Sequence, residues 1–323
     1  MDSPTVSVLI GAYNAAPWIG ETLRSVFDQT YPHLEVVIVD DGSTDGTLAA
    51  IEAAASGTDR DVTILSQENR GACATRNRAF EASTGDLIQY LDADDLLHPQ
   101  KIERQVRRLA QQPFGTVASG PWTRFQDEIP ADLTAVPRES DWRDYEPATD
   151  WLVQSWGGDG TIPLFAWLIP RAIAEAAGPW VEGLLRNQDG EYMARILVET
   201  ERIAFCEGAW GFYRTSGSGS VSARRGRAIA QSLADATERC ERTLLGHKDS
   251  EAHRRAASGL WQMLLFEAYP TAPDLVRQAE ARIEALGGMY RTPGVSRPLR
   301  PIRDYVGWKA AVRLQRLYNR VLR

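Results

Sequence analysis

The sequence has few of the residues that form disulfide frameworks or metal clusters. Among 323 residues there are four histidines and three cysteines, Cys73, Cys206 and Cys240, which lie far apart. An odd number of widely spaced cysteines predicts neither a disulfide framework nor a zinc site. This cysteine usage favours the reducing cytoplasm as the compartment of the protein.

Long apolar runs are also missing. No stretch approaches the roughly 20 residues of a membrane-spanning helix, and no basic segment precedes the short apolar run at residues 6–10. We therefore expect neither a membrane span nor a signal peptide. With 43% hydrophobic and 24% charged residues, the composition is typical of a globular protein with one large domain or two smaller ones.

The first 110 residues contain a regular alternation of strand and helix patterns. Apolar runs at residues 6–10, 35–39, 62–65 and 86–91 predict buried strands, and helical patterns follow them from residues 17, 48, 72 and 99. Short turns between these segments predict a mostly parallel sheet with crossover helices. The segments that follow the strands then meet at one edge of the sheet, where α/β proteins bind ligands.

Three carboxylates, Asp92, Asp94 and Asp95, follow the fourth strand pattern. Asp92 and Asp94 are two residues apart, which predicts that they share one side of an extended chain. Such a pair repels itself unless a cation or sugar hydroxyls compensate it, and a divalent ion that carries a diphosphate would do so. The alternative is an Asp-rich turn that caps the next helix.

Four segments occur in an order that resembles the signature of family 2 glycosyltransferases: VSVLIGAYN from Val6, VVIVDDGSTD from Val36, NRGACATRN from Asn69 and YLDADD from Tyr90. The resemblance covers residues 5–110 strongly and residues 160–222 more loosely. It implies an inverting enzyme of the GT-A fold, a Rossmann-like α/β fold in which helices flank a mostly parallel sheet. Gly11 stands where the family more often has Pro or Thr.

The resemblance implies a nucleotide-sugar site that includes Gly11, Tyr13, Asp41 and Arg76. Asp41 would accept a hydrogen bond from a uracil-type base, Tyr13 would stack on that base, and Arg76 would approach the nucleotide. From the residues alone, Asp40 and Asp41 could form only a turn with Ser43 as the cap of the next helix. Arg76 could equally be a solvated charge on its helix.

The resemblance also assigns the metal site and the acceptor side. Asp94 would bind Mn²⁺ or Mg²⁺ directly, while Asp92 would contact ribose or the metal through water. Asp189 matches the general base that deprotonates the attacking hydroxyl, with Glu191 as the alternative. From spacing alone, Asp189 could be only the N-cap of a helix over residues 190–199. Arg214, with the Gly/Ser-rich segment to Ser222, could close over the diphosphate or form a linker.

Patterns are weaker after residue 111. Residues 113–160 are rich in Pro and Trp and predict an irregular region, which could line an acceptor cleft or simply pack its own loops. Residues 164–169 predict another buried strand. Apolar stripes from residue 229 to residue 286 predict a helical C-terminal extension, with His247 and His253 on its surface.

The charge is unevenly distributed. Residues 291–323 contain nine Lys and Arg against one acidic residue, a net charge of +8, so that residues 1–290 carry −15 of the total −7. We therefore expect a catalytic domain over residues 1–222, a helical region over residues 223–290 and a basic tail over residues 291–323.

The tail contains an amphipathic helical pattern over residues 305–323. Basic residues recur there at intervals of three and four, opposite an apolar side; they are Lys309, Arg313, Arg316, Arg320 and Arg323. This pattern suits the anionic surface of a membrane, and would place the protein peripherally at its inner face. Docking on the acidic body of the protein and binding of a partner are the alternatives. Nucleic acid is not an expected partner, because no surface of basic and aromatic residues accompanies the tail.

Together these features predict an inverting, metal-assisted transfer of a sugar from a nucleoside-diphosphate sugar, preferably a UDP-sugar, to a hydroxyl of a saccharide or lipid-linked acceptor. A nucleotidyltransferase is the first alternative, although the segment after the first strand has no Lys or Arg to hold a triphosphate. A non-catalytic scaffold at the membrane is the second.

Overall fold

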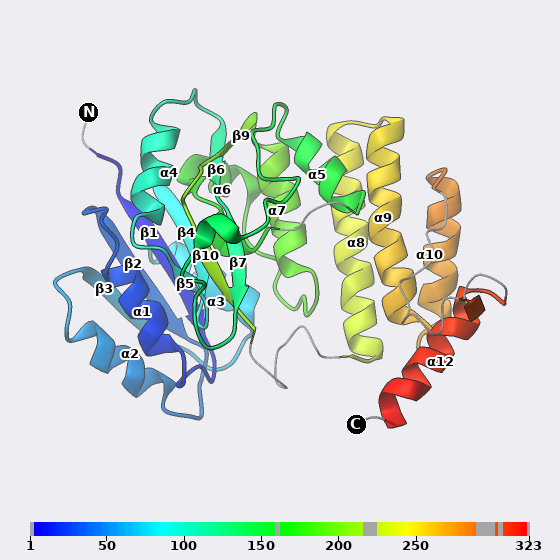
Figure 1. The fold of residues 1–323 in the computed structure, drawn as a ribbon, viewed down its shortest axis with the longest axis horizontal. Helices are drawn as coiled ribbons and strands as arrows, with labels where there is room; N and C mark the ends of the chain where they lie inside the picture. Colours follow the sequence, from blue (N-terminus) through cyan, green and yellow to red (C-terminus); the bar gives the residue numbers. More distant parts are fainter. Residues whose placement is uncertain (1–2, 159–161, 216–224, 289–300, 303–305, 322–323) are drawn as a thin grey trace. The chain divides into compact units, whose positions relative to one another are not determined.

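The computed structural model describes residues 3–158, 162–215, 225–288, 301–302 and 306–321 (Figure 1). The chain divides into two compact units, residues 1–223 and residues 224–323. The first unit is an α/β unit and the second is helical.

A five-stranded sheet forms the centre of the first unit. Its strands are β1 (Val6–Ala12), β2 (Leu34–Asp40), β3 (Asp61–Ser66), β4 (Leu87–Asp92) and β8 (Ile169–Pro170), in the order β3-β2-β1-β4-β8. The first four run parallel, and β8 pairs antiparallel with β4. The predicted mostly parallel sheet is confirmed, with the predicted strands in their predicted places.

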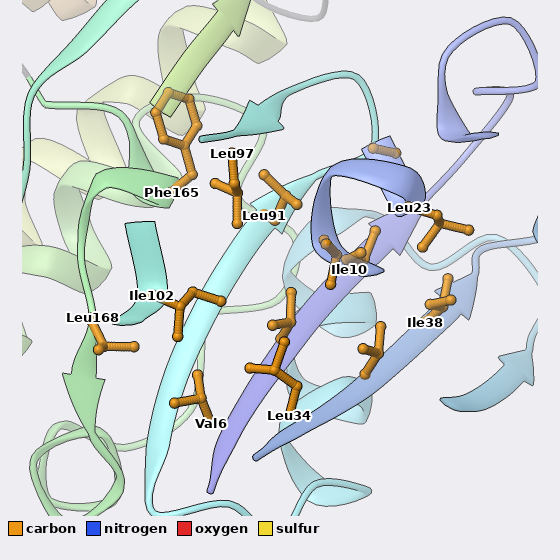
Figure 2. Packing of buried hydrophobic residues seen from close by; sticks show 14 of the residues in the cluster. Val6, Ile10, Leu23, Leu34, Ile38, Leu91, Leu97, Ile102, Phe165 and Leu168 are labelled. Carbon is orange, nitrogen blue, oxygen red and sulfur yellow. The ribbon is translucent and has the colours of Figure 1, made fainter. Parts of the chain in front are cut away.

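Apolar side chains are buried on both faces of this sheet. On one face, Val6 and Ile10 of β1 pack with Leu23 of α1 (Ile19–Phe27) and Ile102 of α4 (Lys101–Leu109), as Figure 2 shows. Leu9, whose side chain alternates with these along β1, is buried as well. The remaining crossover helices are α2 (Thr47–Ala55) and α3 (Ala72–Glu81), and α3 packs against β1 and β2. Burial on both faces explains why the strands are continuous apolar runs.

Short strands extend the first unit beside the main sheet. They are β5 (Leu96–Leu97), β6 (Thr116–Ser119), β7 (Trp122–Phe125), β9 (Arg202–Phe205) and β10 (Gly211–Arg214). β10 lies between β5 and β7, and β6 pairs with β9. Because β5 directly follows the carboxylates at residues 92–95, its pairing with β10 brings Arg214 next to them.

The segment between residues 113 and 160 is more regular than its composition predicts. Besides β6 and β7 it contains the 3₁₀ helix η1 (Leu133–Ala135) and the helix α5 (Thr149–Trp156). Trp142, Trp151 and Trp156 are buried. Trp142 packs against Phe205 and Trp210, and Trp151 packs edge-on against Trp167. These buried rings therefore join the segment to later parts of the first unit, and their use in an acceptor cleft stays a prediction.

The predicted strand at residues 164–169 is wrong for its first half. Residues 164–166 form the 3₁₀ helix η2 (Leu164–Ala166), and pairing with β4 begins only at Ile169. Side-chain amides replace strand partners here, because Gln89 donates to the carbonyl of Phe165 and Gln105 donates to that of Ala166, both at 2.8 Å. The helices α6 (Arg171–Ala177) and α7 (Gln188–Val198) follow.

The second unit is helical, as predicted. It contains α8 (Arg227–His247), α9 (Glu251–Ala268), α10 (Pro273–Ala285) and α12 (Trp308–Val321). Buried residues such as Leu233, Trp261 and Ile283 form its core. The prediction that His253 lies on the surface is wrong: it is buried, and its Nδ1 lies 2.8 Å from Oγ of Ser250 at the start of α9.

The basic amphipathic pattern forms the helix α12, and one side of this helix packs within the second unit. Ala311 is fully buried, and Trp308 packs edge-on against Phe266 and Tyr269. Lys309 Nζ lies 2.7 Å from Glu280 Oε1. Among the helices that the structure describes, none is long and apolar enough to cross a membrane.

Candidate active site

The polar segments after β1, β2 and β4 lie at one edge of the sheet. In the register of the sheet, Gly11 is opposite both Val39 of β2 and Asp92 of β4, and Ala12 is opposite Asp40. The predicted gathering of these segments is therefore confirmed. The side chains of these segments thus lie at the carboxyl ends of parallel strands, where a ligand can reach them.

Gly11 is a point of close approach between β1 and α3. A Cβ atom at this position would lie 2.8 Å from Cγ2 of Thr75. This contact gives a packing reason for glycine where the family more often has a larger residue. Tyr13, two residues further on, has 48% of its surface exposed, so its ring remains available for stacking.

The carboxylate of Asp41 is buried and holds the loop that precedes α3. Its Oδ1 accepts hydrogen bonds from Gln67 Nε2 at 2.6 Å and from the backbone N–H of Arg70 at 2.9 Å, and its Oδ2 accepts one from the N–H of Gly71 at 2.8 Å. A carboxylate has about four acceptor positions, so one remains for a further donor. Binding of a base by Asp41 stays a prediction.

The expectation that Ser43 caps the next helix is wrong. α2 begins at Thr47, whose N–H donates to Oδ1 of Asp45 at 2.9 Å. Ser43 instead accepts a hydrogen bond from the N–H of Asn14 at 3.0 Å. Ser43 therefore does not cap a helix. Its hydrogen bond with Asn14 joins the loop after β1 to the loop after β2.

The prediction that Asp92 and Asp94 share one side of an extended chain is wrong. β4 ends at Asp92, and the N–H of Asp95 donates to the carbonyl of Asp92 at 3.2 Å, which closes a turn. Asp94 thus lies in this turn and not on an extended chain. Burial and the charge of Asp92 raise the pKa of Asp94 to about 6. Burial, together with the charges of Asp92 and Asp94, also raises the pKa of Asp95.

Arg214 holds this turn from the side of β10. Its N–H donates to Asp95 Oδ1 at 2.8 Å, and its Nε donates to the carbonyl of Asp94, also at 2.8 Å. Its Nη2 pairs with Glu21 at 2.6 Å, and its guanidinium lies over the ring of Phe125. In this structure Arg214 therefore positions the carboxylates. The segment that could close over a diphosphate, residues 218–222, lies outside the described residues.

Arg76 is buried between two carboxylates, so the interpretation as a solvated helix charge is wrong. Its Nη2 lies 2.8 Å from Asp92 Oδ1 and its Nη1 lies 3.1 Å from Asp189 Oδ1. Only 10% of the Arg76 side chain is exposed, against 43% and 48% of the two Asp side chains. One guanidinium thus brings together the residues predicted for the donor side and the acceptor side.

Two stacked aromatic rings pack against the guanidinium of Arg76. Its guanidinium carbon lies 4.5 Å from the centre of the Trp180 ring, and that ring stacks on Tyr192 with centres 3.9 Å apart. Asn77 fixes the Trp180 backbone in both directions, accepting from its N–H at 2.8 Å and donating to its carbonyl at 3.0 Å. Sequence reasoning missed this support, although Asn77 stands next to Arg76 in a recognised motif.

Asp189 lies in the first turn of α7 and is not its N-cap. Asn187 takes that place, with a left-handed backbone at φ 54°. Desolvation raises the pKa of Asp189, and this effect outweighs the opposing effect of the Arg76 charge. Glu191 is buried and forms an ion pair with Arg195 at 2.8 Å. Of the two candidate bases, only Asp189 contacts Arg76.

The carboxylates at residues 92 and 94 fit part of a divalent metal site. Both are hard oxygen donors, and Arg214 contacts the backbone carbonyl of Asp94, which leaves the Asp94 carboxylate to other partners. Among the described residues, no three His, Cys, Asp or Glu side chains gather as a ligand set. Such a pair matches Mg²⁺ or Mn²⁺ sites in which substrate phosphates and water supply the other ligands.

Residues 7–152 match the model of the family described as "Glycosyl transferase family 2". These residues belong to glycosyltransferase family 2. The chain is also 36% identical over 129 residues to the "Putative teichuronic acid biosynthesis glycosyltransferase TuaG" of Bacillus subtilis. These 129 residues are 40% of this chain and 51% of that protein. The chain therefore spans about half the length of this relative. Asp189 and Arg214 lie beyond the family 2 match.

Two solved structures resemble a larger part of the chain. TarS 1-349 of S. aureus in complex with UDP-GlcNAc has a TM-score of 0.62 and 16% identity, over 90% of this chain and 95% of that chain. The mannosyltransferase PcManGT of Pyrobaculum calidifontis, in complex with GDP-Man and Mn²⁺, has a TM-score of 0.54 and 21% identity, over 99% of this chain and 88% of that chain. At these identities the likeness establishes the GT-A fold that the sequence predicts.

Proposed function

We propose that the protein is an inverting glycosyltransferase that transfers a sugar from a nucleoside-diphosphate sugar, preferably a UDP-sugar, to a hydroxyl group. The observation that carries this proposal is the contact of Arg76 with both Asp92 and Asp189. It joins a carboxylate at the edge of the family 2 sheet to a carboxylate on α7. An inverting transfer needs a general base that faces the attacking hydroxyl, and it needs stabilisation of the negative charge on the leaving group at the donor side.

Asp189 is the general base in this proposal. Its side chain is half exposed, so an acceptor hydroxyl can reach it. The raised pKa of Asp189 brings its basicity closer to that needed at neutral pH, while Arg76 favours the ionised form that accepts a proton. The hydroxyl oxygen then attacks the anomeric carbon as the bond to the diphosphate breaks, so the anomeric configuration inverts without a covalent intermediate.

The donor is held by the residues at the edge of the sheet. Tyr13 offers an exposed ring for the base, and Asp41 has an acceptor position for its imide N–H. Asp94, with Asp92, would hold Mn²⁺ or Mg²⁺, which when bound offsets the negative charge on the departing diphosphate. Arg214 keeps Asp94 and Asp95 in place for this role. The solved neighbours in complex with UDP-GlcNAc and with GDP-Man support a nucleotide-sugar donor.

The acceptor is a saccharide or a lipid-linked molecule, and α12 supports the second class. This helix leaves Leu314, Leu317 and Tyr318 exposed, at 42%, 57% and 57%. Basic residues accompany these apolar side chains in a tail of net charge +8. Such a helix suits shallow insertion into an anionic membrane surface, which would bring the enzyme to a lipid-linked acceptor and hold it at the inner face of the membrane.

Calorimetric titration tests the donor site directly. We expect one of UDP, GDP and dTDP to bind the wild-type protein in the presence of Mn²⁺ and to bind much more weakly without it. Asp94→Ala should abolish the metal-dependent part of the affinity, because it removes the direct ligand. Asp28→Ala, a change of the same charge at the end of α1, is the control and should bind like the wild type. Absence of metal-dependent nucleotide binding by the wild type would refute the proposal.

A further inference from the structure

Arg76 uses separate nitrogen atoms for its two carboxylate partners. Nη2 donates to Asp92, and Nη1 donates to Asp189 and, at 3.4 Å, to Gln188. A guanidinium is planar and presents its donors in a fixed fork. The fork therefore fixes the directions from which Asp92 and Asp189 can each pair with Arg76.

The surroundings hold the guanidinium and leave the carboxylates free to change partners. Trp180 lies against the guanidinium, and Tyr192 supports Trp180 in turn. The Arg76 side chain is 10% exposed, whereas both carboxylates are nearly half exposed. Arg76 thus keeps its position while Asp92 and Asp189 can respond to what binds beside them.

We propose that Arg76 couples the occupation of the donor site to the state of Asp189. When Asp92 turns towards a bound metal–nucleotide, Arg76 loses one of its two anionic partners. Asp189 then still compensates the buried charge of Arg76, so that Asp92 can be released at a smaller cost. In return Arg76 pairs more fully with Asp189 and keeps it ionised, ready to accept a proton. This inference rests on the proposed donor site at Asp92 and Asp94.

Thermodynamic linkage gives the proposal a consequence that needs no acceptor. If donor binding strengthens the pair of Arg76 with Asp189, then Asp189 must strengthen donor binding by the same factor. Asp189→Asn should therefore weaken the binding of UDP with Mn²⁺ by about five- to tenfold. The loss should depend on Arg76: in an Arg76→Met background, the same change should alter Kd by less than about twofold.

Two further variants separate the coupling from the simple loss of a negative charge. Glu199→Gln also removes one negative charge from α7, but Glu199 is exposed at the far end of that helix, and its change should leave Kd nearly unchanged. Arg76→Lys keeps the charge and loses the fork, so Asp189→Asn should again have little effect in this background. Arg76→Lys also replaces Arg76→Met if the latter does not fold.

The experiment is isothermal titration of these variants with UDP in the presence of Mn²⁺, after thermal denaturation has verified that each is folded. Equal losses from Asp189→Asn in both backgrounds, or no loss in the wild-type background, would overturn the coupling while the donor site stands. If the wild-type protein binds no metal–nucleotide complex, the proposed function and the coupling fall together.

Discussion

Arg195 binds both carboxylate oxygens of Glu191, with Nε 3.0 Å from Oε1 and Nη2 2.8 Å from Oε2. Glu191 lies in the first turn of α7, two residues after Asp189, which pairs with Arg76 of α3. The ion pair with Arg195 commits Glu191 to the packing of the helix. The two acidic residues of the first turn of α7 therefore have different roles, and substitution separates them.

Asp189→Asn should lower the rate of transfer by about 10²- to 10⁴-fold, because it removes the proton acceptor while the shape of the side chain remains. Its thermal stability should change little, since the side chain is half exposed. Rates at saturating donor isolate this effect from the weaker donor binding of the variant. Transfer at the wild-type rate would exclude Asp189 as the base.

Glu191→Gln should have the opposite profile. The change leaves the guanidinium of Arg195 without its ionic partner at a buried position, and should lower the free energy of unfolding by about 3 kcal/mol. The activity of the folded fraction should remain near that of the wild type. Urea denaturation and initial rates on the same preparations measure the two quantities, and a stable but inactive variant would make Glu191 the better candidate base.

Gly11→Ala tests the close approach of β1 and α3. The added Cβ would lie 2.8 Å from Cγ2 of Thr75, so we expect a loss of stability of about 1–3 kcal/mol from overpacking. Thr75→Ser removes that methyl group and keeps the hydroxyl, which donates to the carbonyl of Gly71. The double variant should therefore recover most of the loss. If thermal denaturation shows additive losses, the contact is not the cause.

Lys101 predicts a pH dependence of stability. It is fully buried on α4 and donates to the side-chain oxygens of Gln89 and Gln105, while desolvation lowers its pKa from 10.5 to about 7. Between these values the unfolded chain binds the proton and the folded chain does not, so this residue makes the free energy of unfolding rise with pH from about 7 to about 10. In Lys101→Met this rise should disappear. Parallel urea-denaturation profiles for wild type and variant would contradict the prediction.

The exposed side of α12 predicts binding to anionic vesicles. Leu314→Glu with Leu317→Glu should lower co-sedimentation with phosphatidylglycerol vesicles at least tenfold, because it replaces the inserting side chains with negative charges. Met263→Glu is a matched control: Met263 is 55% exposed on α9, outside the basic tail. Binding that is equal to phosphatidylcholine vesicles, or unaffected by the double substitution, would argue for a protein partner.

The sequence predicts the sheet and its functional edge well, because both depend on local patterns. Runs such as residues 6–10, which alternate with helical patterns, favour parallel strands that are buried on both faces, and polar residues directly after such strands lie at one edge of the sheet. An apolar run alone does not separate a strand from a short helix, which is why the prediction of a strand at residues 164–166 is wrong. Their carbonyls are satisfied by Gln89 and Gln105, which are distant in sequence.

The arrangement within the site could not be predicted in the same way. Arg76 and Asp189 are separated by 113 positions, and nothing in their spacing indicates that they meet. Likewise, Arg214 binds the turn at residues 92–95 only because β10 pairs with β5. The resemblance to family 2 predicts which residues form the site, whereas the partners of these residues follow from tertiary packing.

The stereochemistry of donor hydrolysis tests the central claim most directly. Water can replace the unknown acceptor, and proton NMR identifies the anomer of the sugar that is first released from the nucleotide sugar that binds. Direct displacement assisted by Asp189 predicts the anomer opposite to that of the donor, and almost no release in Asp189→Asn. First release of the anomer with the donor's own configuration, or release by Asp189→Asn at the wild-type rate, would contradict the account.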